Sequence, residues 1–301
     1  MNLSRTETRT GDPANHTSAV TDLDYVGVAR YWRSARTSIL GPYMMDGYGF
    51  PSGAGQFRFR SEKKIVARLI RECSGEGTVL DLGSGIGHWT EFFAHQFAKV
   101  VAVEASQQLF DTLEERCRSL PNVTLLRQNA LSFQPSPIYE IVFTGGLLMY
   151  LNDVDVVGLL RRLRPCLGPS SFIICRESTA PDGILTRTGE YQAAYRSVPI
   201  YESMFREAGF EVISVEPNIP YILMQMGCEL IEWWQRLAPW QGPLTPVLGR
   251  LTYLALRLGN PWVTRLPAML GIAFPELTNH FFVLRPSSEN QPEPADGTTR
   301  S

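Results

Sequence analysis

The sequence is short of cysteine pairs and of net charge, and each shortage excludes a class of protein. Its five cysteines among 301 residues include no Cys-x-x-Cys pair, which argues against a structural zinc site or a disulfide scaffold, so we expect no metal. Scattered free thiols are typical of a reducing compartment, and we expect a cytoplasmic protein. With 28 basic and 30 acidic residues, the net charge is −2. The chain therefore lacks the basic excess of a nucleic-acid-binding protein, and no nucleic-acid partner is expected.

Long apolar runs are also missing. No uninterrupted run of about 18 apolar residues is present, so a membrane-spanning helix is not expected. The first 20 residues are polar and lack the apolar core of a signal peptide. Both ends, residues 1–20 and 287–301, have the composition of disordered segments. Between them, a hydrophobic content of 44% is enough to build a full core.

Short apolar stretches alternate with stretches of helical periodicity in most of the chain. The predicted strands are 77–81, 100–103, 123–126, 140–144, 171–175, 210–215 and 280–284. The predicted helices are 62–73, 90–97, 107–120, 154–163 and 201–208. This alternation is typical of an α/β fold with a mostly parallel seven-stranded sheet and helices on both faces. We expect a cap at 21–61, a core at 62–216 and a last core strand at 280–286.

Residues 217–279 break this rhythm as an insertion before the last strand. They are rich in apolar side chains, contain four of the six tryptophans, and are divided by prolines into two or three short predicted helices. Four interpretations stay open: a lid over an apolar ligand, a thicker core, a contact with a membrane surface and a homodimer interface. Arg250 and Arg257 are seven residues apart on one helix face, where they would meet lipid headgroups. A large apolar patch is equally typical of a contact between protein chains.

The clearest functional motif is Val-Leu-Asp-Leu-Gly-Ser-Gly-Ile-Gly at residues 79–87. A predicted strand runs into Gly83, Gly85 and Gly87, and a predicted helix follows. Glycines allow a tight turn and let a ligand lie against bare backbone. Asp81 comes two residues before the first glycine, and Glu104 ends the next strand, where a carboxylate can accept hydrogen bonds from both hydroxyls of a ribose. The spacing differs from the Gly-x-Gly-x-x-Gly of nicotinamide-binding proteins.

These residues resemble the class I S-adenosylmethionine-dependent methyltransferases. The resemblance continues at Asn129-Ala130, at residues 140–150 (EIVFTGGLLMY) and at residues 165–168 (PCLG), and it covers 62–215 with 280–284. It implies a Rossmann-like fold with S-adenosylmethionine as the cofactor. The contacts that it implies are Asp81, Gly83, Ser84 and Gly85 at the methionine end, Glu104 at the ribose, Asn129 and Ala130 at the adenine, and Thr144 and Gly145 near the sulfonium. Gly87 and Ala105 are also expected to bind the cofactor.

An aromatic and glycine-rich segment lies within the predicted cap. Tyr31-Trp32 and then residues 46–49 (DGYG) resemble, over a short stretch, the protein α-N-terminal methyltransferases, where such segments close over the cofactor. Tyr31 and Trp32 are therefore expected to contact the cofactor. Those enzymes also use acidic residues to hold a protonated N-terminus. The corresponding residues 176–187 here include Glu177 and Asp182 but also two arginines, so the substrate is not expected to carry over.

Residues that contact the methyl acceptor should follow the fourth and fifth strands, at the carboxyl edge of the sheet. The expected residues offer hydroxyl, guanidinium or imidazole groups: Tyr150, Arg176, Tyr191, Tyr195, Arg196 and His280. Arginines suit a carboxylate or a phosphate on the acceptor. The Asn/Asp-Pro-Pro-Tyr/Phe motif of enzymes that methylate amino groups of DNA bases does not follow the fourth strand, where Thr-Gly-Gly-Leu stands instead.

The sequence thus predicts methyl transfer by in-line displacement to a nitrogen or oxygen of a small-molecule or lipid-like acceptor. Two alternatives stay open. In one, the acceptor is the N-terminus of a protein or peptide, which would need an open, acidic groove. In the other, the chain binds S-adenosylmethionine as a regulator without turnover. The intact Asp81, glycines and Glu104 indicate cofactor binding under all three hypotheses.

Overall fold

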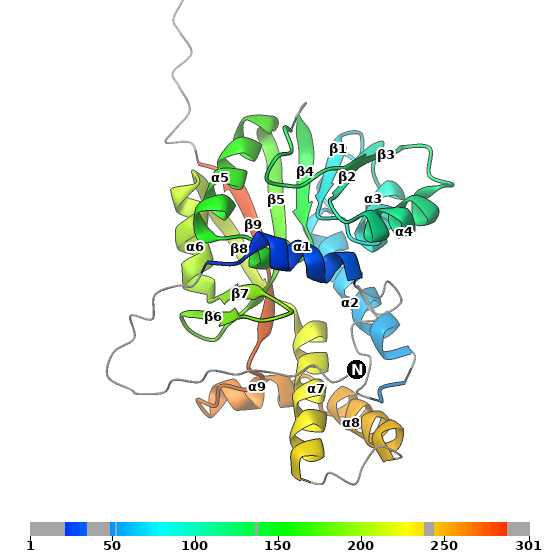
Figure 1. Cartoon of the computed structure of the whole chain (residues 1–301), viewed down its shortest axis with the longest axis vertical. Helices are drawn as coiled ribbons and strands as arrows, with labels where there is room; N and C mark the ends of the chain where they lie inside the picture. Colours follow the sequence, from blue (N-terminus) through cyan, green and yellow to red (C-terminus); the bar gives the residue numbers. More distant parts are fainter. Residues whose placement is uncertain (1–21, 35–48, 52, 136–137, 238–243, 288–301) are drawn as a thin grey trace, which may run out of the picture.

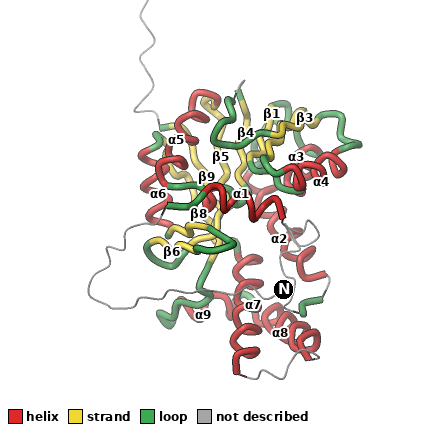
Figure 2. Tube along the Cα trace, viewed as in Figure 1, coloured by secondary structure: helices red, strands yellow, loops and turns green. Residues whose placement is uncertain are grey.

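The computed structural model of the chain describes residues 22–34, 49–51, 53–135, 138–237 and 244–287. The predicted disordered ends, apart from Ser287, lie outside these residues, and so do positions 46–48 of the cap motif. Figure 1 shows a twisted sheet with helices around it and a further group of helices beyond one end of the strands. Figure 2 shows that this second group contains helix but no strand in its described part.

A sheet of nine strands forms the centre of the described chain. Five core strands run parallel in the order β3-β2-β1-β4-β5, β9 pairs antiparallel with β5, and β8 pairs with β9. Their bounds are β1 (Thr78–Leu82), β2 (Lys99–Glu104), β3 (Val123–Arg127), β4 (Tyr139–Thr144), β5 (Leu167–Thr179), β8 (Phe210–Pro217) and β9 (Thr278–Pro286). The seven predicted strands are all present, and the expected fold class is confirmed.

The predicted number of seven strands is wrong because a hairpin adds two. Strands β6 (Ile184–Arg187) and β7 (Ala193–Arg196) pair antiparallel, and β7 joins the sheet where Arg196 pairs with Thr179 of β5. The pairing between β4 and β5 stops at Cys175, so the last residues of β5 have an open edge on that side. The hairpin pairs with this edge, which lies at the carboxyl end of the parallel strands.

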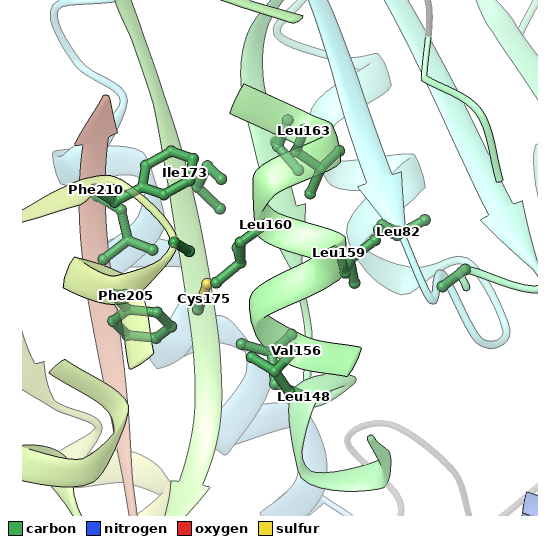
Figure 3. Close-up of a cluster of buried hydrophobic side chains, with 14 of the residues drawn as sticks. Leu82, Leu148, Val156, Leu159, Leu160, Leu163, Ile173, Cys175, Phe205 and Phe210 are labelled. Atoms are coloured by element: carbon green, nitrogen blue, oxygen red, sulfur yellow. The ribbon is translucent and has the colours of Figure 1, made fainter. Parts of the chain in front are cut away.

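Helices cover both faces of the sheet because side chains alternate along each strand. On one face Leu80 and Val142 pack against α5 (Asp153–Leu163) and α6 (Val198–Glu207). Figure 3 shows this cluster around α5. On the other face Val79 and Ile141 pack against α2 (Gly53–Leu69) and α3 (His88–Ala94), and α4 (Gln107–Cys117) packs beside α3.

Helix α5 illustrates why these segments are helical. Its apolar positions Val156, Leu160 and Leu163 recur at helical spacing and are fully buried. Asp153 and Asp155 lie in its first turn, and two arginines lie in its last turn. Both placements complement the helix dipole, so local sequence and tertiary packing favour the same element.

In its described residues, the insertion forms three helices between β8 and β9: α7 (Ile219–Leu237), α8 (Thr245–Gly259) and α9 (Trp262–Met269). With 19 residues, α7 is longer than the short helices predicted there. The partner of Thr179 at the end of β5 is Thr278 at the start of β9, so the insertion re-enters the sheet at the carboxyl end of β5. None of the helices in the described residues combines the length and apolarity needed to cross a membrane.

Candidate functional site

A cavity of about 1370 Å³ opens at the carboxyl ends of the parallel strands. Its walls come from the ends of β1, β2, β4 and β5, from α1 (Tyr25–Ser34) and α2, and from the β6–β7 hairpin and the first turns of α7. Ligands of open α/β sheets bind at this edge, where loops follow neighbouring strands. The cavity is therefore the candidate active site.

One side of the cavity is the glycine turn between β1 and α3. Gly85 has a φ of 56°, and a Cβ built on it would have no other atom within 4 Å, so its backbone faces open space. Its N–H donates a 2.9 Å hydrogen bond to Glu104 Oε2, and the N–H of Ser106 donates a 2.8 Å bond to Glu104 Oε1. The open space at Gly85 exists because glycine has no side chain, and it lies beside the fixed carboxylate of Glu104. This space fits the adenosine and methionine parts of S-adenosylmethionine.

Asp81 lies at the end of β1 in the same wall and is buried. Burial raises its pKa to about 7, and the hydrogen bond from Thr90 opposes this shift only in part. Thr90 Oγ1 donates to Asp81 Oδ2 over 2.6 Å, which fixes the carboxyl group. A carboxyl group with this pKa gains from a cationic ligand such as the ammonium group of a methionine moiety, because an opposite charge favours the ionised form.

Helix α1 closes the cavity over the cofactor side. Ser106 Oγ donates a 3.1 Å hydrogen bond to the carbonyl oxygen of Trp32. The Trp32 ring lies edge-on to Tyr31 and Tyr150, at centroid distances of 5.3 and 5.2 Å. The aromatic pair predicted in the cap therefore lines the cavity.

Three tyrosines of the lining lie next to the aromatic pair of α1. The hydroxyl oxygens of Tyr150 and Tyr191 are 3.0 Å apart, and those of Tyr191 and Tyr195 are 2.8 Å apart. Burial raises the pKa of all three phenols, so they stay protonated at neutral pH. Neutral hydroxyls that share hydrogen bonds can orient a polar acceptor group by donating or accepting.

A cluster of two arginines, a glutamate and a tyrosine also lines the cavity: Arg58, Arg176, Glu62 and Tyr221. Of these residues, only Arg176 was predicted. Arg176 Nη2 donates a 2.9 Å hydrogen bond to Glu62 Oε1, and Arg58 Nε lies 3.7 Å from the same oxygen. Both guanidinium carbons lie 5.5 Å from the centroid of the Tyr221 ring. The missed residues are on α2 and α7. These helices reach Arg176 of β5 only through tertiary packing, which local sequence does not reveal. The available signal was the pairing of Arg58 with Glu62 four residues later on one helix face.

Most predicted site residues line this one cavity. They are Tyr31, Trp32, Asp81, Gly83, Ser84, Gly85, Glu104, Ala105, Asn129, Ala130, Gly145, Tyr150, Arg176, Tyr191 and Tyr195. The structure places four others outside the lining: Gly87, Thr144, Arg196 and His280. The ligand contacts of the residues in the lining stay predictions.

Two predicted acceptor residues are corrected on structural grounds. Arg196 is 1% exposed, forms an ion pair with Asp153, and donates to the carbonyl oxygens of Leu148, Leu151 and Ala194. Its guanidinium therefore holds the backbone around β7 rather than a ligand. The Nδ1 atom of His280 lies 2.8 Å from Thr179 Oγ1, so this ring bridges β9 to β5.

Two predicted cofactor residues are corrected in the same way. The hydroxyl of Thr144 donates to Glu177 Oε1 inside the sheet. Gly87, with a φ of 83°, is the residue before α3, and a Cβ there would come 2.6 Å from Leu113 Cδ1. Gly87 is thus needed for the turn and for helix packing.

The two acidic residues weighed for an N-terminal substrate do not line the cavity. Glu177 is buried and accepts hydrogen bonds from the backbone N–H groups of Leu147, Leu148 and Met149. Asp182 is exposed and accepts from the N–H of Gly183. In the described part of the chain, no three His, Cys, Asp or Glu side chains gather in a way that could hold a metal ion.

Comparison with known proteins agrees with this geometry. Residues 79–170 match the model of a methyltransferase domain. The N-terminal Xaa-Pro-Lys N-methyltransferase 1-B of Xenopus laevis is 24% identical over 216 residues, which cover 68% of this chain and 94% of that protein.

Two solved structures share the fold. A SAM-dependent methyltransferase of Leishmania major has a TM-score of 0.59 at 15% identity, covering 87% of this chain and 82% of that chain. The O-methyltransferase of a trans-AT PKS multienzyme of Brevibacillus brevis, in complex with S-adenosyl-L-homocysteine, has a TM-score of 0.55 at 12% identity, covering 85% and 80%.

Proposed function

We propose that this S-adenosylmethionine-dependent methyltransferase acts on a small or lipid-like acceptor, at a nitrogen or oxygen atom. The enzyme class and the cofactor, both expected from the sequence, are confirmed by the domain match and the related proteins. The proposal on the acceptor is carried by one observation. The tyrosine wall of Tyr150, Tyr191 and Tyr195 lines the same cavity as the glycine turn and Glu104.

The residues of the chain have three tasks in this proposal. Asp81, Gly85 and Glu104 would hold the cofactor, which supplies an electrophilic methyl group on its sulfonium. Tyr150 and Tyr191 orient the acceptor atom through their hydroxyl groups. Helix α1 and the β6–β7 hairpin exclude water from the reacting groups.

The polar wall indicates what else the acceptor carries. Arg176 is mostly buried and lines the cavity, where its Nη2 is paired with Glu62. A guanidinium group in this lining favours a carboxylate or phosphate group on the acceptor.

The second candidate function is methylation of a protein or peptide N-terminus, as the name of the Xenopus laevis relative describes for that protein. The acidic residues on the acceptor side of the cavity support this function less well than they support a small-molecule acceptor. Glu62 is paired with Arg176 and Glu276 with Arg187, and Glu190 also lines the cavity. These pairings leave less negative charge for a protonated N-terminus than an acidic groove would provide.

Transfer of a labelled methyl group separates these functions. The panel contains small amines, phenols, amine-bearing lipids in micelles, and a peptide beginning Xaa-Pro-Lys. Tyr191→Phe removes the central hydroxyl of the tyrosine wall, and we expect at least tenfold slower transfer with an unchanged affinity for S-adenosylhomocysteine. Tyr253→Phe is the matched control, because Tyr253 packs between Phe50 and Phe57 outside the cavity.

The outcomes are distinct. Transfer to the peptide alone would support the second function. Binding of S-adenosylhomocysteine without transfer to any member of the panel would favour the regulatory alternative. Equal rates for Tyr191→Phe and Tyr253→Phe would contradict the role of the tyrosine wall.

A further inference from the structure

Exposed apolar side chains are concentrated on the helices of the insertion. All but four of the large apolar residues that are exposed in the described chain lie between positions 230 and 272. Soluble domains rarely expose large apolar patches unless the patch meets a partner or a lipid surface. The lining of the cavity includes no residue from 244–272, so the catalytic site does not explain this exposure.

Helix α8 has two apolar faces. Gly249, Tyr253 and Leu256 are buried against the rest of the protein. The opposite face carries Val247, Leu251, Leu254 and Leu258, with exposed fractions of 55, 61, 52 and 76%. At 3.6 residues per turn these four positions fall within an arc of about 60°. One face of α8 therefore builds the core of the insertion, and the other is an apolar stripe in solvent.

Helix α9 repeats this arrangement. Trp262, Leu266 and Met269 are exposed at helical spacing, with 77% of Trp262 accessible. Both α8 and α9 pack against α7, and Figure 1 shows them at the end of the molecule away from most of the sheet. The stripes of α8 and α9 thus belong to one group of helices.

The charges beside the stripes have one sign. Arg250, Arg257 and Arg265 each directly precede a leucine of a stripe and are exposed. No aspartate or glutamate occurs from residue 244 to residue 275. This segment is therefore locally cationic in a chain whose net charge is −2. On a helix, a position one residue away is rotated by about 100°, which places each arginine at the edge of its stripe.

This charge pattern distinguishes the partners that could cover the surface. A second copy of the chain, joined through the same patch, would bring arginines against arginines with no acidic residue of the patch between them. An anionic lipid surface instead accepts apolar side chains at its acyl boundary and arginine guanidinium groups at its headgroups.

We propose that the exposed face of α8 and α9, formed by the two stripes and their three arginines, docks on a membrane surface that contains anionic lipid. Docking is peripheral, with the helices parallel to the surface. The proposal goes beyond the proposed function, because it holds for whichever acceptor the cavity takes.

Vesicle cosedimentation of the full chain tests this proposal. Phosphatidylcholine vesicles with phosphatidylglycerol should bind the protein at least tenfold more strongly than phosphatidylcholine alone. Leu254→Gln combined with Leu258→Gln should lower binding to the mixed vesicles at least tenfold, and Arg250→Gln combined with Arg265→Gln should remove the preference for anionic lipid. The matched controls are Val154→Gln and Arg206→Gln, exposed residues on α5 and α6. All of these side chains are exposed, so the variants should fold.

Two further measurements make the test independent of catalysis. Tryptophan emission should shift to shorter wavelength on binding, and the shift should shrink in Trp262→Phe. Light scattering after size exclusion reports the mass. Absence of wild-type binding to the mixed vesicles, or equal binding by the leucine variant, would overturn the proposal. A homodimer that the leucine variant dissociates would overturn it in favour of a second copy. Affinity for S-adenosylhomocysteine, measured alongside, tests the proposed function separately.

Discussion

At the scale of single residues, Asp81 makes the stability of the ligand-free protein depend on pH. Burial raises its pKa from the ordinary 3.8 to about 7. Between these two pKa values, Asp81 is protonated in the folded protein and ionised in the unfolded chain. The stabilisation from this proton is complete below about pH 4 and is lost as the pH rises through 7. Asp81→Asn cannot ionise, so it should escape this loss.

We expect Asp81→Asn to be more stable than the wild type at pH 8 by on the order of 2 kcal/mol, and to lose this advantage at pH 4. Urea unfolding without ligand at both pH values measures the difference. Asp111→Asn, on the exposed face of α4, is the control and should follow the wild type. A wild type whose stability rises between pH 4 and pH 8 as steeply as that of Asp81→Asn would contradict the shifted pKa.

Glu104 has a double role that Glu104→Ala should reveal. Its carboxylate holds the N–H groups of Gly85 and Ser106, and it lines the cavity where a ribose is expected. We expect its loss to weaken S-adenosylhomocysteine binding at least tenfold, about 1.4 kcal/mol. Titration calorimetry measures the affinity, with Glu114→Ala on the exposed side of α4 as the control. An affinity within twofold of the wild type would remove Glu104 from the cofactor site.

Residue type and spacing predicted the cofactor side of the site better than the acceptor side. Asp81, the glycines and Glu104 lie in a short segment whose strand–turn–helix pattern fixes their relative positions. Arg176 and Arg196 are indistinguishable in sequence, yet one lines the cavity and the other is held by Asp153 and carbonyl groups. Such a difference depends on which elements pack together, and local sequence does not contain it.

At the scale of elements, the turn between β1 and α3 separates two functions of glycine. Gly85 has open space where a Cβ would stand, whereas a Cβ on Gly87 would come 2.6 Å from Leu113 of α4. Both have positive φ, so alanine at either position strains the backbone by about 1 kcal/mol. The additional clash at Gly87 should destabilise the packing of α3 on α4.

We expect Gly87→Ala to lower the free energy of unfolding by about 2–4 kcal/mol. Gly85→Ala should cost only the backbone strain but should weaken S-adenosylhomocysteine binding, because its methyl group enters the cavity. Chemical unfolding and calorimetry on the two variants form a matched pair. Equal losses of stability would contradict this division of roles.

The core elements could be predicted because their apolar spacing is regular, as in β2 and α5. The β6–β7 hairpin could not, because its sequence around Arg187 and Glu190 has the composition of a loop and its pairing depends on the open edge of β5. Helix α1 was missed for a similar reason. Its sequence is amphipathic, but only Gly27 in it is buried, and its place in the fold depends on tertiary contacts with α4 and with Tyr191 of the hairpin.

At the scale of the whole molecule, the cavity connects parts of the chain that are far apart in sequence. Residues of α1, the glycine turn, the β6–β7 hairpin and the first turns of α7 line it together, whereas α8 and α9, in their described residues, contribute none. Ligand binding should therefore stabilise a defined set of elements. The outer helices of the insertion should respond to a lipid surface instead.

Hydrogen exchange measured by mass spectrometry tests this separation. S-adenosylhomocysteine should slow exchange in α1 and in the glycine turn, because Ser106 links α1 to the strand end that carries Glu104. Exchange in α8 and α9 should not change with this ligand and should slow when vesicles containing phosphatidylglycerol are added. Slower exchange in α8 and α9 on cofactor binding alone would mean that the insertion acts as a lid. A lid would couple membrane contact to the catalytic site, so that each would change the affinity of the other. Independent responses would mean that membrane docking does not change the affinity for the cofactor.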